Sequence, residues 1–314
     1  MILDKGYEFV DLPPRVVRSE RPHARWDRRM DGTLSGRVEL SLRTEQPVHI
    51  GSGGKEVRDG RLIVRAARVH DGAGVPGSSL KGVLRARYEA STCSCAGEPL
   101  RSGQFMGINS SSTEFTRALF LPDVPPSPPC GDQRRDRTSC SACALFGRMS
   151  SRSRITVTDL TCVEPRFELV EMPMRYSPNL HHAGPRRGED DHFVVTGLHG
   201  RKFHRGRGPA APKLQSVEVI PLGRVLTGQI RIFNVTPVEL GGLLSALGID
   251  PHSALKLGGG KSHGFGRIRC AATFHLSGSA SRDPAVWRAQ LMASADYWGR
   301  GEAQLLALHG KELE

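Results

Sequence analysis

The chain has 314 residues, and its 44 Lys and Arg outnumber its 32 Asp and Glu, which gives a net charge of +12. Arginine supplies 36 of the basic residues, and its guanidinium suits forked phosphate contacts and stacking on bases. This favours a nucleic-acid partner, although an arginine-rich genome would produce the same composition. No apolar run reaches the roughly 18 residues of a membrane span, and the first residues lack the pattern of an export signal. We expect a cytoplasmic protein with no membrane partner.

The first half of the chain contains three recognisable elements. Residues 1–35 form a basic arm, and residues 36–43 alternate apolar and polar side chains as a half-buried strand does. A glycine-rich turn and a polar loop follow, and they reach Asp59. Apolar residues at helical spacing then predict a helix over 80–88, which Ser78 or Ser79 would cap.

The second half alternates strands and helices. Residues 154–160, 217–220, 227–233 and 267–274 read as strands, and residues 174–215 form a long insertion. Thr236, Pro237 and Glu239 have the spacing of a capping box, so a helix is expected from there to Gly248. This order predicts an α+β protein with an antiparallel sheet and helices on one face, as in a ferredoxin-like core. A helical tail runs from Pro284 to Leu308.

A glycine-rich run at residues 257–267 is the first candidate site. It ends like a phosphate-binding loop, but Leu255 stands where a nucleotide-binding loop needs glycine, and a strand rather than a helix follows. Lys261, His263 and Arg267 add charge to a backbone that a phosphate can approach closely. Binding of an RNA backbone and a simple tight loop both remain open.

The helix start at residues 76–82 is the second candidate. Helix N-termini bind anions through free backbone N–H groups, and Ser78, Ser79 and Lys81 would add side-chain contacts. A capped helix without a ligand explains the same residues equally well.

Cysteines form the third candidate. Five of the seven lie between residues 93 and 143, and the spacing of Cys140 and Cys143 is typical of structural zinc sites. Zinc prefers four ligands, so we expect four of these five to bind it: Cys93, Cys95, Cys130, Cys140 and Cys143. Cys130 and one of the first two would complete the set, and unligated thiols are the alternative.

The order of these motifs resembles the RAMP superfamily of CRISPR-associated proteins, and more specifically the backbone subunit of type III effector complexes or their relatives. The motifs are His49–Gly53 with 76–82, then Cys143–Gly147 with Arg154 and Asp159, then 258–266, and 200–203 resembles a further feature. The resemblance covers about residues 36–275. It divides the chain into an arm at 1–35, a RAMP domain at 36–275 and a helical tail at 276–314.

The resemblance implies an RRM-like, ferredoxin-type fold whose subunits stack along a CRISPR guide RNA, together with other effector subunits, and present it to a complementary target RNA. The insertions would be a zinc-binding segment at about 91–147 and a β-hairpin thumb at about 174–215. The expected RNA-binding residues are His49, Ser78, Ser79, Lys81, Arg85, Gly259, Gly260, Lys261, His263, Arg267, Arg201 and Lys202.

Many such subunits also cut target RNA with an acidic residue between the first strand and first helix and a divalent Mg²⁺ or Mn²⁺. Asp59 is the candidate here, and a loop aspartate in a subunit that only binds is the alternative. Two other functions also stay open. One is a CRISPR precursor-RNA processing endoribonuclease that uses a histidine. The other is a zinc-containing nucleic-acid-binding protein outside CRISPR.

Overall fold

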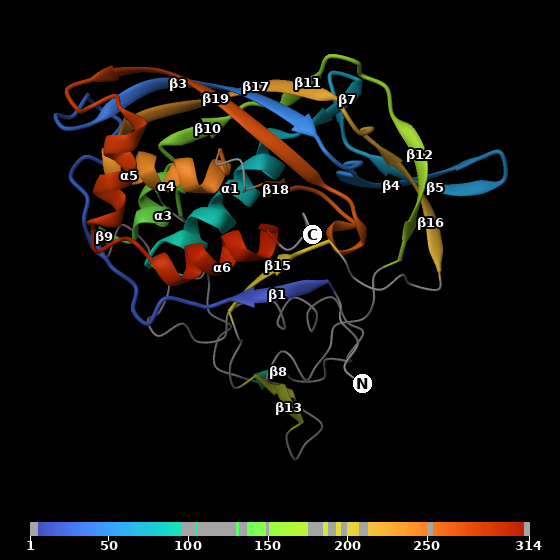
Figure 1. Cartoon of the computed structure of the whole chain (residues 1–314), viewed down its shortest axis with the longest axis horizontal. Helices are drawn as coiled ribbons and strands as arrows, with labels where there is room; N and C mark the ends of the chain where they lie inside the picture. The colour runs from blue at the N-terminus through green and yellow to red at the C-terminus, as the bar shows by residue number, and fades with distance from the viewer. Residues whose placement is uncertain are drawn as a thin grey trace.

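A computed structural model describes residues 6–95, 104–105, 130–131, 137–148, 151–174, 185–187, 193–195, 200–206, 213–249 and 254–310. It confirms a mixed α+β fold, in which a long antiparallel sheet carries helices on one face (Figure 1). Within these ranges no helix is long and apolar enough to cross a membrane.

The main sheet is built around two long strands, β3 (Leu34–Thr44) and β17 (Val225–Val235), which pair antiparallel with each other. The strand order is β18-β19-β3-β17-β11-β7-β6, with β10 also on β17. The remaining strands are β18 (Leu255–Lys256), β19 (Arg267–Gly278), β11 (Leu160–Cys162), β10 (Ile155–Val157), β7 (Gly72–Val75) and β6 (Arg68–Val69). Every pairing in this sheet is antiparallel, as predicted.

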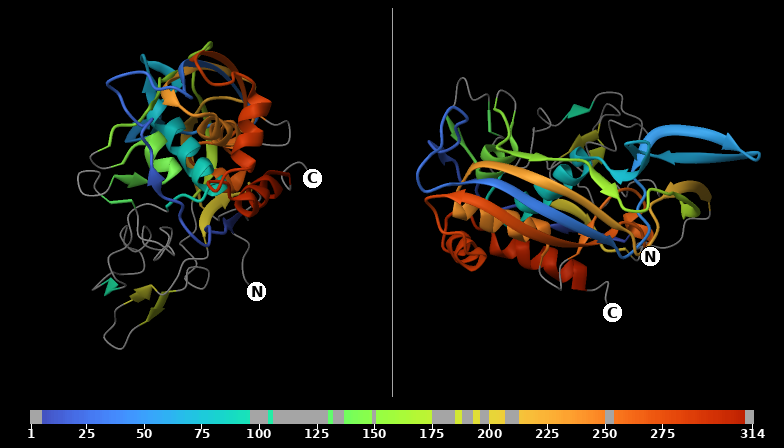
Figure 2. Two further views of the ribbon diagram at one scale, coloured as in Figure 1. Left: turned by 90° about the vertical axis from the view of Figure 1, so that its left-hand side faces the viewer. Right: turned by 90° about the horizontal axis from the view of Figure 1, so that it is seen from above.

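In the described part of the chain, helices cover only one face of this sheet, and none lies over the outer face of β19, β3 and β17 (Figure 2, right). The helices are α1 (Gly77–Ser91), α3 (Ser141–Phe146), α4 (Pro237–Leu247), α5 (Pro284–Met292) and α6 (Gly299–Gly310), with a 3-10 turn η2 at Lys261–His263. The alternation in β3 follows from this arrangement. Val38, Leu40 and Leu42 are buried toward the helices, while Arg37 and Glu39 are exposed.

Two helix ends test the capping predictions. Thr236 and Glu239 form the predicted capping box, and Gly248 ends α4 in the left-handed conformation. The expected cap of α1 by Ser78 or Ser79 is wrong, because the helix begins at Gly77 and both serines lie inside its first turn.

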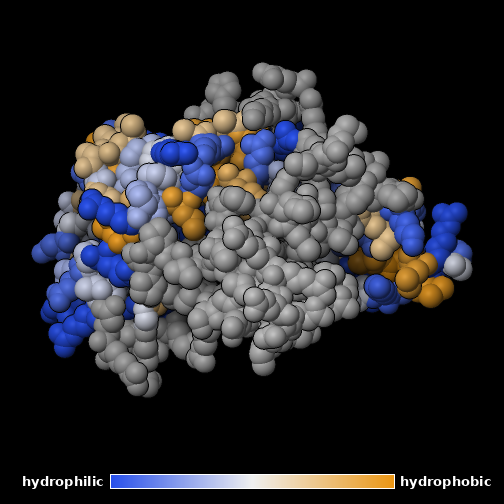
Figure 3. Space-filling view, turned by 90° about the horizontal axis from the view of Figure 1, so that it is seen from below, coloured by the Kyte–Doolittle hydropathy of each residue, from blue (hydrophilic) through white to orange (hydrophobic). Residues whose placement is uncertain are grey.

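Residues 51–76 form two hairpins rather than the predicted turn and loop. Strands β4 (Gly51–Arg58) and β5 (Arg61–Ala66) pair with each other and join β16 (Leu214–Val219) and β12 (Glu168–Pro173) in a four-stranded sheet. Glycine and charged residues hide the strand pattern of β4. The hairpin projects from the body (Figure 1), and Val57 and Leu62 near its tip are exposed. Hydrophobic and hydrophilic side chains lie side by side at one end of the lower face of the molecule (Figure 3).

The N-terminal arm is held against the body from residue 6 onward. Strand β1 (Tyr7–Val10) pairs with β15 (Arg201–His204), and β2 (Ser19–Glu20) pairs with β9 (Thr138–Ser139). Arg21 makes a two-pronged ion pair with Asp296, beyond α5. The predicted helical tail is made of two helices, α5 and α6. Arg21 joins the arm to the segment between them.

Part of the expected thumb, residues 174–215, is described. Strands β13 (Pro185–Arg187) and β14 (Phe193–Val195) form an antiparallel hairpin, and β14 also pairs with β8 (Gln104–Phe105). Much of the remainder of this insertion, and most of 91–147, lies outside the described residues.

Candidate nucleic-acid interface and cysteine cluster

Three segments that are far apart in the sequence meet in an open groove of about 560 Å³ on the helix side of the sheet. We call it the helix-side groove. It is lined by the segment after β3, the first turns of α1 and the glycine-rich loop: His49, Gly51, Ser78, Ser79, Gly259 and Lys261. The fold thus brings together residues from the three segments that the sequence singled out.

The glycine-rich loop lies directly against the segment after β3. Gly258 has a φ of 85°, and a Cβ there would lie 2.2 Å from the carbonyl oxygen of His49. The N–H of Gly259 donates to that same oxygen at 2.8 Å. Gly260 and Gly264, which flank the turn η2, are also left-handed, with φ of 67° and 83°. Glycine is therefore required here by both conformation and space.

His49 is buried, with 5% of its surface exposed. Its Nδ1 lies 2.7 Å from the carbonyl oxygen of Glu218. Because a carbonyl oxygen only accepts hydrogen bonds, Nδ1 carries the proton and the ring is fixed in one tautomer. The residue thus stabilises the wall of the helix-side groove.

The start of α1 is partly occupied by an internal carboxylate. The N–H of Gly77 donates to Oδ1 of Asp159 at 2.7 Å, and the N–H of Ser79 donates to the carbonyl of Pro76 at 2.9 Å. Asp159 is therefore the anion that caps this helix, a role the sequence motif did not reveal. Burial, and then the nearby charge of Arg85, lower the pKa of Lys81.

Three of the expected RNA-binding arginines lie in buried or half-buried ion pairs. Arg85 Nε is 2.8 Å from Glu89 Oε1, and Arg201 Nη1 is 2.7 Å from the other oxygen of Glu89. Arg267 Nε is 2.8 Å from Glu45 Oε2. None of the three lines the helix-side groove.

Two further expected basic residues, Lys202 and His263, make local contacts. The Nζ of Lys202 lies 4.0 Å from the centre of the Tyr7 ring, and His263 Nδ1 lies 3.0 Å from the Ser262 hydroxyl. Neither residue is among those that line the helix-side groove.

Four of the five clustered cysteines converge. The sulfurs of Cys95, Cys130, Cys140 and Cys143 all lie within 4.8 Å of one another. Cys95 is 3.5 Å from Cys143 and 3.6 Å from Cys140, sulfur to sulfur. Four thiolates at 2.3 Å from a tetrahedral zinc ion would be about 3.8 Å apart, so this set fits zinc. Cys93 lies outside the cluster, and its sulfur is 3.5 Å from the carbonyl of Tyr297.

Two arginines lie beside this cluster. Arg201 donates to the carbonyl of Cys95 at 2.9 Å, and Arg85 Nη2 lies 3.8 Å from the sulfur of Cys143. Four thiolates around one Zn²⁺ carry a net charge of −2, which adjacent guanidinium groups offset. Arg85 and Arg201 thus belong to the surroundings of the cysteines in this fold.

Asp59 lies at the exposed tip of the β4–β5 hairpin. Its φ is 51° and that of Gly60 is 73°, the combination that closes a two-residue hairpin turn. Among the described residues, the four cysteines form the one group of three or more metal-ligating side chains, and Asp59 is not part of it.

Two comparisons with known proteins found similarities. The family model described as the RAMP superfamily matches residues 41–269. A solved structure titled "Type IV-B CRISPR Complex" is similar over 82% of this chain and 99% of that chain, with 16% identity and a TM-score of 0.38. No curated protein matches the chain in sequence.

Proposed function

Because the chain belongs to the RAMP superfamily, we propose that it is the guide-RNA-binding backbone subunit of a CRISPR effector ribonucleoprotein, of type III or derived from it. Its partners are the guide RNA, a complementary target RNA, other effector subunits and further copies of itself. The β13–β14 hairpin belongs to the proposed thumb.

A ferredoxin-like core is part of this proposal. The chain runs β3, α1, β10 and β11, β17, α4, β19, and the sheet order of these strands is β19-β3-β17-β11. Two strand–helix–strand units whose strands interleave in an antiparallel sheet give this order, and it supports the assignment.

The observation that carries the proposal is the helix-side groove. It gathers the start of α1, His49 and the glycine-rich loop on one surface, with Lys261 as its cation. Closely packed backbone, hydroxyl groups and a lysine suit a ribose–phosphate backbone and offer little that reads base identity. This is the behaviour expected of a subunit that leaves sequence recognition to base pairing.

The zinc ion has a structural role in this proposal. Cys95, Cys130, Cys140 and Cys143 would hold it, and four thiolates leave no open position for chemistry on a substrate. The ion would tie the insertion after α1 to the start of α3.

The experiment uses Gly82, which lies in the second turn of α1 and lines the helix-side groove. A Cβ there meets nothing within 4 Å, so a side chain can leave the helix at this position without a clash at its first atom. Gly82→Glu places a carboxylate where the phosphate backbone is proposed to lie, and we expect RNA binding to weaken by at least about tenfold. Gly82→Ala is the matched control and should bind RNA as the wild type does, with a slightly more stable helix.

Assembly provides the second readout. On guide RNAs of two lengths, light scattering should count more subunits on the longer RNA, and Gly82→Glu should abolish this assembly. One subunit per RNA at both lengths would contradict the backbone role and favour the processing endoribonuclease. Equal RNA binding by the Glu and Ala variants would remove the groove from the proposal.

Target cleavage by Asp59 stays a prediction. Asparagine accepts the left-handed backbone of Asp59, so Asp59→Asn should keep the hairpin and remove only the carboxylate. With Mg²⁺ or Mn²⁺, the wild-type assembly should cut a complementary RNA, and the variant should bind that RNA without cutting it. A wild-type assembly that leaves the RNA intact would refute the cleavage prediction and leave the binding role untouched.

A further inference from the structure

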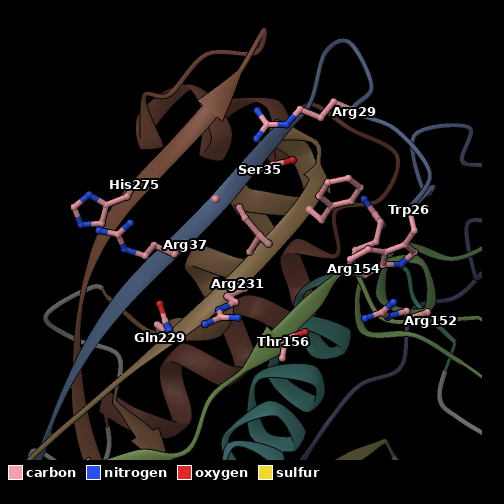
Figure 4. Close-up of a pocket in the computed structure, with 13 residues that line it drawn as sticks. Trp26, Arg29, Ser35, Arg37, Arg152, Arg154, Thr156, Gln229, Arg231 and His275 are labelled. Carbon is pink, nitrogen blue, oxygen red and sulfur yellow. The ribbon is translucent and has the colours of Figure 1, made fainter.

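A second groove of about 640 Å³ lies on the opposite, outer face of the main sheet (Figure 4). Within the described ranges, no helix covers that face (Figure 2). We call this groove the sheet-side groove. It shares no lining residue with the helix-side groove. Five arginines and no Asp or Glu line it, and Trp26 of the N-terminal arm lies at its edge.

The floor of the sheet-side groove is a row of residues in register across four strands. Thr156 lies opposite Arg231, Arg231 opposite Arg37, and Arg37 opposite His275. Like charges directly opposite each other destabilise a sheet. Glu39 pairs with Arg37, and an anion bound between Arg37 and Arg231 would offset the remaining repulsion.

Stacking fixes the guanidinium of Arg152 at the edge of the sheet-side groove. Trp26 stacks on Phe233, with ring centres 5.1 Å apart and planes 8° from parallel. Arg152 lies over Trp26, 4.3 Å from the ring centre. A guanidinium fixed by stacking keeps its N–H groups for a ligand.

Asn234 fixes the arm that carries Trp26. Its side chain accepts from the N–H of Met30 and donates to the carbonyls of Arg25 and Arg28, at 3.1, 3.1 and 2.7 Å. Asn234 is fully buried at an irregularity of β17. The position of Trp26 on Phe233 is therefore fixed by hydrogen bonds from the core.

Most of the positive charge around the sheet-side groove is uncompensated. Arg154 is buried and paired with Glu239 of α4. Glu39, outside the groove, is 3.0 Å from Arg37 Nε and 3.3 Å from His275 Nε2. In the described part of the chain no carboxylate pairs with the remaining three arginines of the groove, which are Arg29, Arg152 and Arg231.

We propose that the sheet-side groove binds the phosphodiester backbone of a single-stranded nucleic acid, as a site separate from the helix-side groove. Arg37 and Arg231 contact phosphates, and the stack of Arg152 on Trp26 forms the end of the path. The core of a protein–protein interface is depleted of charged residues, whereas this floor is a row of Thr, Arg, Arg and His. The charge and chemistry therefore favour nucleic acid over a protein partner.

The test compares two double variants that remove the same charge from the same sheet face. Arg37→Ala with Arg231→Ala strips the floor of the groove. Arg43→Ala with Arg269→Ala removes another directly opposite pair, which lies outside it. Both are made in the Gly82→Glu background, which closes the helix-side groove. The probe is a labelled oligouridine of about 12 nucleotides, and binding is followed by anisotropy across a salt series.

The groove variant should bind roughly tenfold more weakly than the control pair, and the slope of log affinity against log salt should fall by about 1.4 for two lost phosphate contacts. Its unfolding midpoint should not fall. Oligouridine carrying 4-thiouridine should cross-link to peptides that contain Trp26 or His275.

Three results would overturn the proposal. They are equal losses in both double variants, no loss in the groove variant, or a groove variant that binds RNA normally but no longer joins other subunits. None of these bears on the proposed function, which the single Gly82 variants test on their own.

Discussion

The two grooves lie on opposite faces of one sheet and are lined by different chemical groups. The helix-side groove consists of glycines, serine hydroxyls and backbone, and arginines near it such as Arg85 and Arg267 are paired with glutamates. The sheet-side groove consists of arginine side chains with one glutamate at its border. We therefore expect RNA binding in the first groove to depend on shape, and nucleic-acid binding in the second to depend on charge and to weaken steeply with salt.

Loss of the proposed metal should have the largest effect, and it should affect the helix-side groove more than the sheet-side groove. The reason is that the cysteine cluster lies beside Arg85 of α1. We expect the wild type to hold roughly one zinc per chain, and Cys140→Ser to lose it and to be less stable. Cys93→Ser is the control, since a serine hydroxyl can replace the thiol that faces the carbonyl of Tyr297. Metal content by mass spectrometry measures both. Normal zinc in the Cys140 variant would exclude this cluster as the site.

The buried ion pair of Arg154 and Glu239 joins the sheet-side groove to helix α4. Breaking it should cause the next largest loss, which is a loss of stability. Glu239→Ala leaves a buried guanidinium without its partner, which costs about 3–5 kcal/mol of unfolding free energy. The exposed pair of Arg37 and Glu39 is the comparison, and Glu39→Ala should leave the denaturation midpoint unchanged. Equal midpoints for the two variants in urea would show that the buried pair contributes nothing.

The same pair predicts an acid dependence of stability. Burial raises the pKa of Glu239, but Arg154 and His23 lower it more, so it lies below the ordinary value of 4.5. The contribution of this carboxylate is therefore complete above about pH 4.5 and is lost as the pH falls. We expect the difference in unfolding free energy between wild type and Glu239→Gln to shrink between about pH 5 and about pH 3. A difference in unfolding free energy that stays constant over this pH range would contradict the prediction.

Two glycines should distinguish close packing from backbone strain, and the difference between the two variants, about 1–3 kcal/mol, should be the smallest of these effects. Both have left-handed φ, but a Cβ at Gly258 would meet His49, whereas one at Gly264 meets nothing within 4 Å. Gly264→Ala should cost about 1–2 kcal/mol, and Gly258→Ala about 2–5 kcal/mol, together with RNA binding in the helix-side groove. Thermal unfolding and anisotropy report the two quantities. Identical losses would mean that the contact with His49 is unimportant.

Local sequence signals predicted the parts of the fold that depend on neighbours in the chain. The capping box at Thr236 needs only residues three apart, and the cysteine pair at Cys140 and Cys143 lies within one turn. The choice between Cys93 and Cys95 could not be made, because spacing does not tell which thiol turns toward the cluster. Asp159 capping Gly77, 82 residues away, has no local signal.

The sheet-side groove shows the same limit on a larger scale. Trp26, Arg152 and Arg231 look like scattered surface residues in the sequence, and only strand register and the arm brought back by Asn234 place them together. The β4–β5 hairpin was missed for a different reason. Its glycines and charges suit a strand that projects into solvent, where alternation with a core is absent.

The placement of β3 constrains how the protein is made. This central strand, at residues 34–44, pairs along its whole length with β17 and β19, and β19 ends at residue 278. The arm before it is fastened to α6 by a hydrogen bond from Asp11 to Gln304, 293 residues apart. During synthesis, β3 therefore cannot complete its pairing until β17 and then β19, both much later in the sequence, have been made. A chain truncated before β19 would expose one edge of β3, ready to pair with another molecule.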